Sequence, residues 1–121
     1  MSPENHRLKA ERIEHSLTKL TPADWEIQIE AAMLAGTHWV NFVLHQTGIS
    51  ANNEDMVHAS MTTVSMLRKY TLAEPAMIEH LEEIEELRPL FVRGDIANGA
   101  QAGQRALHLL NAIGARAREL I

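Results

Sequence analysis

Apolar residues recur at intervals of three and four along most of the chain, which is the period of an α-helix buried on one side. Near the N-terminus this stripe consists of Ala10, Ile13, Leu17 and Leu20. Charged residues such as Lys9 and Glu11 lie on the other faces. The pattern predicts a surface helix that starts at Ser2-Pro3, because proline is well tolerated at the first helical position.

The second predicted helix runs from Pro22 to about Gln46 and is the longest apolar element. Thr21 and Asp24 flank its first turn as a capping pair, and the aspartate lies near the positive end of the helix dipole. Gly48 suits the left-handed residue that ends many helices. We expect this helix to be the most buried element of the protein.

Two helices are predicted to follow. The first spans Glu54 to Tyr70 after a cap at Asn53, and the second spans Pro75 to Leu87. Pro89 must end or kink the second of these helices. The inward residues of the Glu54–Tyr70 helix are expected to be Met56, Val57, Met61, Val64 and Leu67.

A final helix follows the loop from Gly94 to Gly99 and reaches nearly to Ile121. Its small residues predict a closely packed neighbouring helix; they are Ala102, Gly103, Ala106 and Gly114. No strand series or internal repeat is present. The sequence therefore predicts an all-α fold, an up-and-down helical bundle of four to five helices, in a single domain over residues 1–121.

The charge balance is acidic, since 11 Lys and Arg residues oppose 16 Asp and Glu residues for a net charge of −5. Nucleic-acid binding is not favoured, because proteins that follow a phosphate backbone are usually basic. Without cysteine the chain has neither disulfides nor thiolate metal ligands. No apolar run is long enough for a membrane span and no secretion signal is recognised, so we expect a cytoplasmic protein.

Polar residues gather on one side of the apolar second helix. This polar stripe consists of Glu30, His38, Asn41 and His45. Three interpretations are open: a face that is exposed or satisfied by structural hydrogen bonds, a pocket for a ligand or partner, and a metal site. Arg88 similarly interrupts the apolar arc of the helix that ends at Leu87, and a buried bidentate pair between Arg88 and Glu30 is a hypothesis.

For a metal, His38 and His45 are the candidates, because they lie two turns apart on one face. Neither the paired histidines of metalloprotease helices nor the Glu-x-x-His motif of di-iron bundles occurs, so no metal is assigned and no cofactor is identified. Asp55 and His58 are spaced as a local acid and imidazole pair that surface helices often produce by chance. His58 and His108 are interpreted as solvated surface residues.

The order of elements resembles the small HEPN-like helical-bundle proteins of prokaryotes. The resemblance lies in the segment Ile27–Ala32, in the stretch from His38 to Gly48, and in the segment Leu87–Asp95, where that superfamily carries an arginine-led motif. Active HEPN ribonucleases have a histidine four to six residues after the arginine. Neither Arg88 nor Arg93 has one, so the resemblance implies fold and dimerisation rather than nuclease activity.

Two functional hypotheses follow. We favour a non-catalytic HEPN-like interaction module, because no complete catalytic constellation is present. The alternative is a bundle that binds a small ligand or metal, with a pocket formed by the polar stripe and Arg88. A homodimer is expected, because the chain is 45% hydrophobic and the aromatic residues Trp39 and Phe91 are interpreted as prone to exposure.

Overall fold

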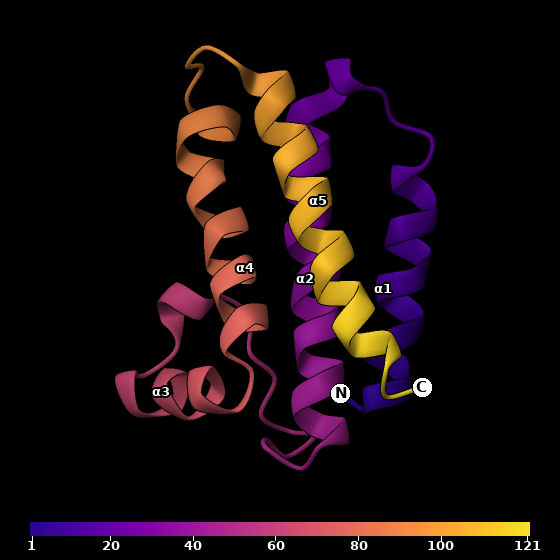
Figure 1. The fold of residues 1–121 in the computed structure, drawn as a ribbon, viewed down its shortest axis with the longest axis vertical. Coiled ribbons are helices and arrows are strands. Elements are labelled where there is room, and N and C mark those ends of the chain that lie inside the picture. Colours follow the sequence, from indigo (N-terminus) through magenta and orange to yellow (C-terminus); the bar gives the residue numbers. More distant parts are fainter.

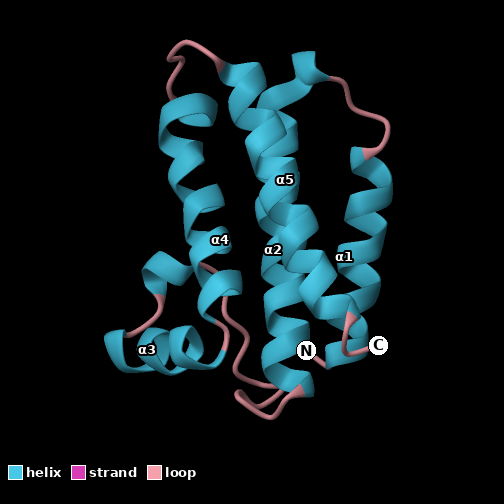
Figure 2. Cartoon of the chain, viewed as in Figure 1, coloured by secondary structure: helices cyan, strands magenta, loops and turns pink.

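The computed structural model describes residues 1–121 and contains five α-helices and no strand (Figure 2). Consecutive long helices run in opposite directions and form an up-and-down bundle (Figure 1); they are α1 (Pro3–Leu17), α2 (Trp25–Gln46), α4 (Pro75–Leu87) and α5 (Gly99–Arg118). The short helix α3 (Val64–Ala73) packs against α4 beside the bundle. The predicted all-α class is confirmed.

Helix α2 is the central element, with 14 of its 22 residues buried. It packs against α1, α4 and α5. Figure 1 shows it behind α5, with α1 and α4 on either side. The expectation that this helix is the most buried element is confirmed. None of the helices combines the length and the apolar character that crossing a membrane requires.

Helices α2 and α5 approach closely at a glycine. A Cβ atom on Gly103 would lie 2.5 Å from Gln28 Oε1 and 3.1 Å from the Cα atom of Trp25. Both distances are shorter than ordinary van der Waals contact, so only glycine allows this approach. The close neighbour predicted from the small residues of the last helix is therefore present.

The predicted helix starts and stops are largely confirmed. Ser2 caps α1, and Thr21 and Asp24 form a complete capping box. The box opens a short 3-10 turn, η1 (Pro22–Asp24), before α2 begins. Gly48 has a φ of +76°, as expected of a left-handed helix stop.

The predicted helix from Glu54 to Tyr70 is wrong. Residues 51–58 form an irregular loop, followed by a 3-10 turn, η2 (Ala59–Met61), and helix α3 begins only at Val64, where Thr63 caps it. Of the residues expected to point inward, Val57, Met61 and Val64 are 63%, 77% and 76% exposed.

The reason is that side chains from other helices bind the backbone of this segment. The Asn41 side chain on α2 bonds both the N–H and the carbonyl of Met56, and the Glu85 carboxylate on α4 accepts from the N–H of Ala59. A backbone N–H or carbonyl that is held in this way is not available to an α-helical ladder.

Pro89 ends α4 as predicted. The chain continues from Leu87 into a wider π-type turn, η3 (Arg88–Arg93), in which the N–H of Gly94 donates to the carbonyl of Pro89 at 3.0 Å. The loop before α5 contains Asn98 with a φ of +74°.

The interpretation of Trp39 as an exposed aromatic is wrong. Its side chain is fully buried, its indole N–H donates to Glu14 on α1, and its ring meets Phe42 edge-on. Phe91 is half-buried against the core. Trp39 therefore gives no support to a homodimer, which stays a prediction.

Candidate metal centre

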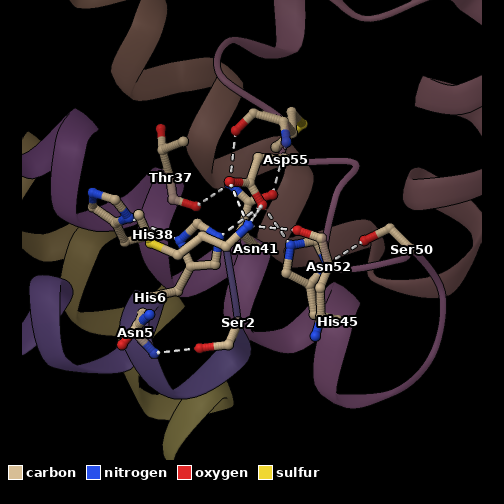
Figure 3. A network of polar contacts seen from close by, with 12 residues as sticks. Ser2, Asn5, His6, Thr37, His38, Asn41, His45, Ser50, Asn52 and Asp55 are labelled. Atoms are coloured by element: carbon tan, nitrogen blue, oxygen red, sulfur yellow. Dashed lines mark hydrogen bonds and ion pairs between the residues drawn. The ribbon is translucent and has the colours of Figure 1, made fainter.

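Three histidines and an aspartate meet where α1 begins and α2 ends (Figure 3). His6 comes from the first turns of α1, His38 and His45 come from α2, and Asp55 comes from the loop that follows α2. His6 lies one turn before Ala10 on the buried stripe of α1, so helix packing itself directs its imidazole into the bundle.

Both buried imidazoles point at the same carboxylate oxygen. His6 Nε2 lies 2.9 Å and His45 Nε2 lies 2.7 Å from Asp55 Oδ1. One ligand atom from each of the three residues lies within 4.8 Å of the others. His6 and His45 are 2% and 6% exposed, whereas the Asp55 side chain is 32% exposed. The two imidazoles are therefore shielded from solvent, and solvent reaches the cluster at the Asp55 carboxylate.

The second nitrogen of each imidazole also has a partner. His6 Nδ1 lies 2.9 Å from His38 Nδ1, and His45 Nδ1 lies 2.7 Å from Ser50 Oγ. Rotation of the rings about their bonds would break both contacts, so these partners fix the orientation of the Nε2 atoms.

Asn41 positions Asp55 through the backbone of the next residue. Its Nδ2 donates to the carbonyl of Met56 at 2.7 Å and to that of Thr37 at 3.0 Å, and its Oδ1 accepts from the N–H of Met56 at 2.8 Å. Asn41 is 1% exposed, so these bonds form away from water. They hold the loop against α2 beside His45.

Electrostatics favour an ionised Asp55 carboxylate and neutral imidazoles at His6 and His38. Burial opposes ionisation of Asp55, but hydrogen bonds from His45, His6 and the α-amino group of Met1 outweigh it and lower its pKa to about 2. Burial also lowers the pKa of His6 and that of His38. These are the protonation states in which aspartate and histidine bind metal ions.

The α-amino group of Met1 is a further cation at this site. It donates to the carbonyl of Asn52 and lies 3.2 Å from Asp55 Oδ2. This ion pair is partly exposed, since the two groups are 30% and 32% accessible. The ammonium therefore balances the charge of Asp55 on the side of the carboxylate that faces solvent.

The polar stripe predicted on α2 divides into two parts. Asn41 and His45 are buried in the cluster and His38 is half-buried behind His6, whereas Glu30 lies apart and contacts Arg88. The ligand candidates His38 and His45 do not converge on one point. His45 instead converges with His6 and Asp55.

The hypothesised pairing of Arg88 with Glu30 is present, with Arg88 Nε 2.7 Å from Glu30 Oε1. It is neither bidentate nor buried, because it has a single hydrogen bond and its side chains are 30% and 38% exposed. The terminal amino groups of Arg88 form no hydrogen bond within the chain.

Sequence reasoning missed His6 and misjudged Asp55. The burial of His6 could have been predicted from its position, because it lies one turn before Ala10 on the same face of the helix as Ala10 and Leu17. The local pair of Asp55 and His58 does not form. His58 is half-buried rather than fully solvated and lies 3.6 Å from Glu85, whereas His108 is exposed as predicted.

The chain matches no protein-family model, no curated protein and no solved structure. The comparisons therefore identify no family, HEPN-like proteins included.

Proposed function

We propose that this protein binds one divalent transition-metal ion through His6 Nε2, His45 Nε2 and the Asp55 carboxylate. The observation that carries the proposal is the convergence of two buried imidazole nitrogens on one carboxylate oxygen at 2.9 and 2.7 Å. Two histidines and one carboxylate, with further positions left to solvent or ligand, form a recognised donor set for such ions.

The spacing of the donor atoms suits a small ion. Bonds of about 2.0–2.1 Å to nitrogen and oxygen, set at right angles, separate neighbouring donor atoms by about 2.9 Å. The two nitrogen-to-oxygen distances are already near that value. The three donor atoms lie within 4.8 Å of one another, so an ion among them requires the side chains to adjust around it.

The neighbours of the imidazoles favour reversible binding. Without metal, His6 and His45 each donate Nε2–H to the carboxylate, so each Nδ1 accepts, from His38 or Ser50. With metal, each Nε2 supplies its lone pair and each Nδ1 must carry the proton. An imidazole and a hydroxyl can both reverse their roles, so the same contacts serve both states.

The donor set favours some ions over others. Imidazole suits Zn²⁺, Co²⁺, Fe²⁺ and Ni²⁺, whereas Mg²⁺ and Ca²⁺ prefer sites made wholly of oxygen. No thiolate is available, because the chain lacks cysteine. We therefore expect selectivity for a first-row transition ion over alkaline-earth ions.

The test is titration of the metal-free chain with Co²⁺, read by its visible absorption and by native mass spectrometry. One ion per chain is expected. Asp55→Asn should weaken binding at least about 100-fold, since the amide keeps a hydrogen-bond acceptor for the imidazoles but loses the charge. Its circular dichroism should match the wild type.

The matched control is His108→Ala, which removes an exposed histidine on α5 and should leave Co²⁺ affinity unchanged. Equal affinity in Asp55→Asn and the wild type contradicts the proposal, as does the absence of saturable binding in the wild type.

A second candidate function is the HEPN-like interaction module that assembles with a second copy of this chain. It is supported by apolar side chains on η2 and α3 that face solvent beside the bundle: Met61, Val64 and Leu72 are 77%, 76% and 79% exposed. Exposed apolar side chains that lie together on one surface are typical of association sites. The cytoplasmic location remains a prediction alongside it.

Light scattering of the full chain at micromolar concentration tests this second candidate. A dimeric mass is expected, and a combined Val64→Glu, Leu72→Glu variant should be monomeric while it still binds Co²⁺. Leu8→Glu on α1 is the control and should remain dimeric. A monomeric wild-type mass contradicts the candidate without affecting the metal proposal.

A further inference from the structure

A cavity of about 340 Å³ borders the His6–Asp55 edge of the cluster. Its wall includes both of these proposed ligands and also His38, while Arg88 lines it from η3. Most of the remaining lining is apolar, from residues that include Met33, Leu34, Met56 and Val57. A cavity of this size lies within the range of small-molecule pockets.

Arg88 offers unused donors in this cavity. Its Nε bonds Glu30 Oε1, and no other hydrogen bond of its guanidinium is formed within the chain. The two terminal amino groups are therefore available to an anionic partner, and a planar guanidinium suits a carboxylate in particular. The side chain is 30% exposed, so a ligand displaces little protein to reach it.

The charges around the cavity make the binding of an anion depend on the metal ion. Arg88 is paired with Glu30, and Asp55 is paired with the α-amino group of Met1, so these four groups sum to zero. An anion entering the metal-free site gains little, because the Asp55 carboxylate lines the cavity and Arg88 is already paired with Glu30. A divalent ion at the cluster would add two positive charges to the wall of the cavity that Arg88 also lines, and these charges would attract an anion.

We propose that the cavity between this cluster and Arg88 binds a small organic carboxylate with an apolar body, whose head group contacts both the metal ion and the guanidinium. This inference rests on the proposed metal function. The apolar lining favours a monocarboxylate over phosphate, because a multiply charged, strongly hydrated anion loses more solvation there. The methionine side chains can adapt to the shape of the apolar body.

The experiment uses the full chain in two stages. Co²⁺ is first titrated alone, and hexanoate is then titrated into the Co²⁺-loaded protein with the visible spectrum and calorimetry as readouts. Hexanoate is expected to perturb the spectrum and to bind at least about tenfold more tightly than hexanamide, which lacks the charge. Inorganic phosphate should bind more weakly than hexanoate.

Two substitutions give opposite expected results. Arg88→Gln should lower hexanoate affinity about tenfold and leave Co²⁺ affinity unchanged, because the arginine does not contact the ion. Glu30→Gln should raise hexanoate affinity about threefold, because it frees the guanidinium. Arg93→Gln is the matched control, since this neighbouring arginine lies outside the cavity, and it should change neither affinity.

The stages separate the two proposals. Failure to bind Co²⁺ overturns the metal function, and the carboxylate inference falls with it. Normal Co²⁺ binding overturns the carboxylate inference alone if hexanoate does not bind, if Arg88→Gln binds it as tightly as the wild type, or if phosphate binds more tightly than hexanoate.

Discussion

The side-chain amide of Asn41 bonds both backbone polar groups of Met56, at 2.7 Å to the carbonyl and 2.8 Å from the N–H. This two-way bond between α2 and the loop fixes the residue that follows Asp55. It replaces the backbone hydrogen bonds that a helix would otherwise give this segment. The geometry of the candidate metal centre therefore depends on an amide that is not itself a ligand.

Asn41→Ala should lower the free energy of unfolding by about 2–3 kcal/mol, because it leaves two buried backbone groups of Met56 without partners. Urea denaturation measures the loss, and amide hydrogen exchange at Met56 should become faster. Asn111→Ala, an exposed asparagine on α5, is the control and should change stability by less than about 0.5 kcal/mol. Unchanged exchange at Met56 would contradict this role of Asn41.

Stability should fall on mild acidification. The pKa values of His6 and His38 lie below the ordinary value of 6.5 in the folded state, so the unfolded chain takes up these protons first. Their contribution to stability is complete above about pH 6.5 and is lost as the pH falls below that value through the lower pKa values of the folded state. Urea unfolding between pH 7.5 and pH 5 measures it, and the pH dependence should be smaller in His6→Gln.

A separate loss is expected at lower pH. Asp55 has a pKa of about 2 when folded, against an ordinary 3.8. Its contribution is therefore complete above about pH 4 and disappears as the pH falls towards 2. The Asp55→Asn variant should not show this loss of stability below pH 4, but it should still show the loss that begins near pH 6.5. Parallel curves for the variant and the wild type below pH 4 would contradict the assignment.

Ser50→Ala should weaken Co²⁺ binding about 10- to 100-fold, because the hydroxyl that orients the His45 ring is lost while all three ligands remain. Ser60→Ala, an exposed serine on η2, should have no effect. Metal at 100 times its dissociation constant should stabilise the wild type by about 2.7 kcal/mol, and a chelator should reverse the gain. If Ser50→Ala binds Co²⁺ as tightly as the wild type, Ser50 does not orient a metal ligand.

Gly103→Ala should destabilise the fold by about 1–3 kcal/mol, because the added Cβ meets Gln28 and the backbone of Trp25. The neighbouring exposed residue on α5 provides the control, since Gln104→Ala should change stability by less than about 0.5 kcal/mol. Thermal unfolding compares the two variants. A Gly103→Ala protein as stable as the wild type would show that α2 and α5 can separate at no cost.

Much of the fold was predictable from the sequence because caps and apolar periodicity are local signals. Thr21 with Asp24, Gly48 and Pro89 each mark a boundary that depends on a few neighbouring residues. The error at residues 54–63 has a different origin. Asn41 and Glu85 bind that segment from 15 and 26 residues away, and no local pattern records such contacts.

The candidate site was predictable only in part, for a similar reason. His45 and Asn41 stood out because they are polar residues on an apolar helix. His6 was detectable in principle from its place on the α1 stripe, but Asp55 had no such signal, because its position comes from the loop that Asn41 holds. A carboxylate in a polar segment looks like any other solvated residue until tertiary contacts are known.

The three proposed ligands belong to α1, α2 and the following loop, and 49 residues separate His6 from Asp55. An ion held by all three therefore fastens the N-terminal helix to its neighbours much as a crosslink does. With the proposed ion bound, helix α1 could not swing away without breaking a coordinate bond. The dissociation rate of the ion would then limit how often the bundle opens, and a slowly exchanging metal would give the protein resistance to proteolysis and forced unfolding.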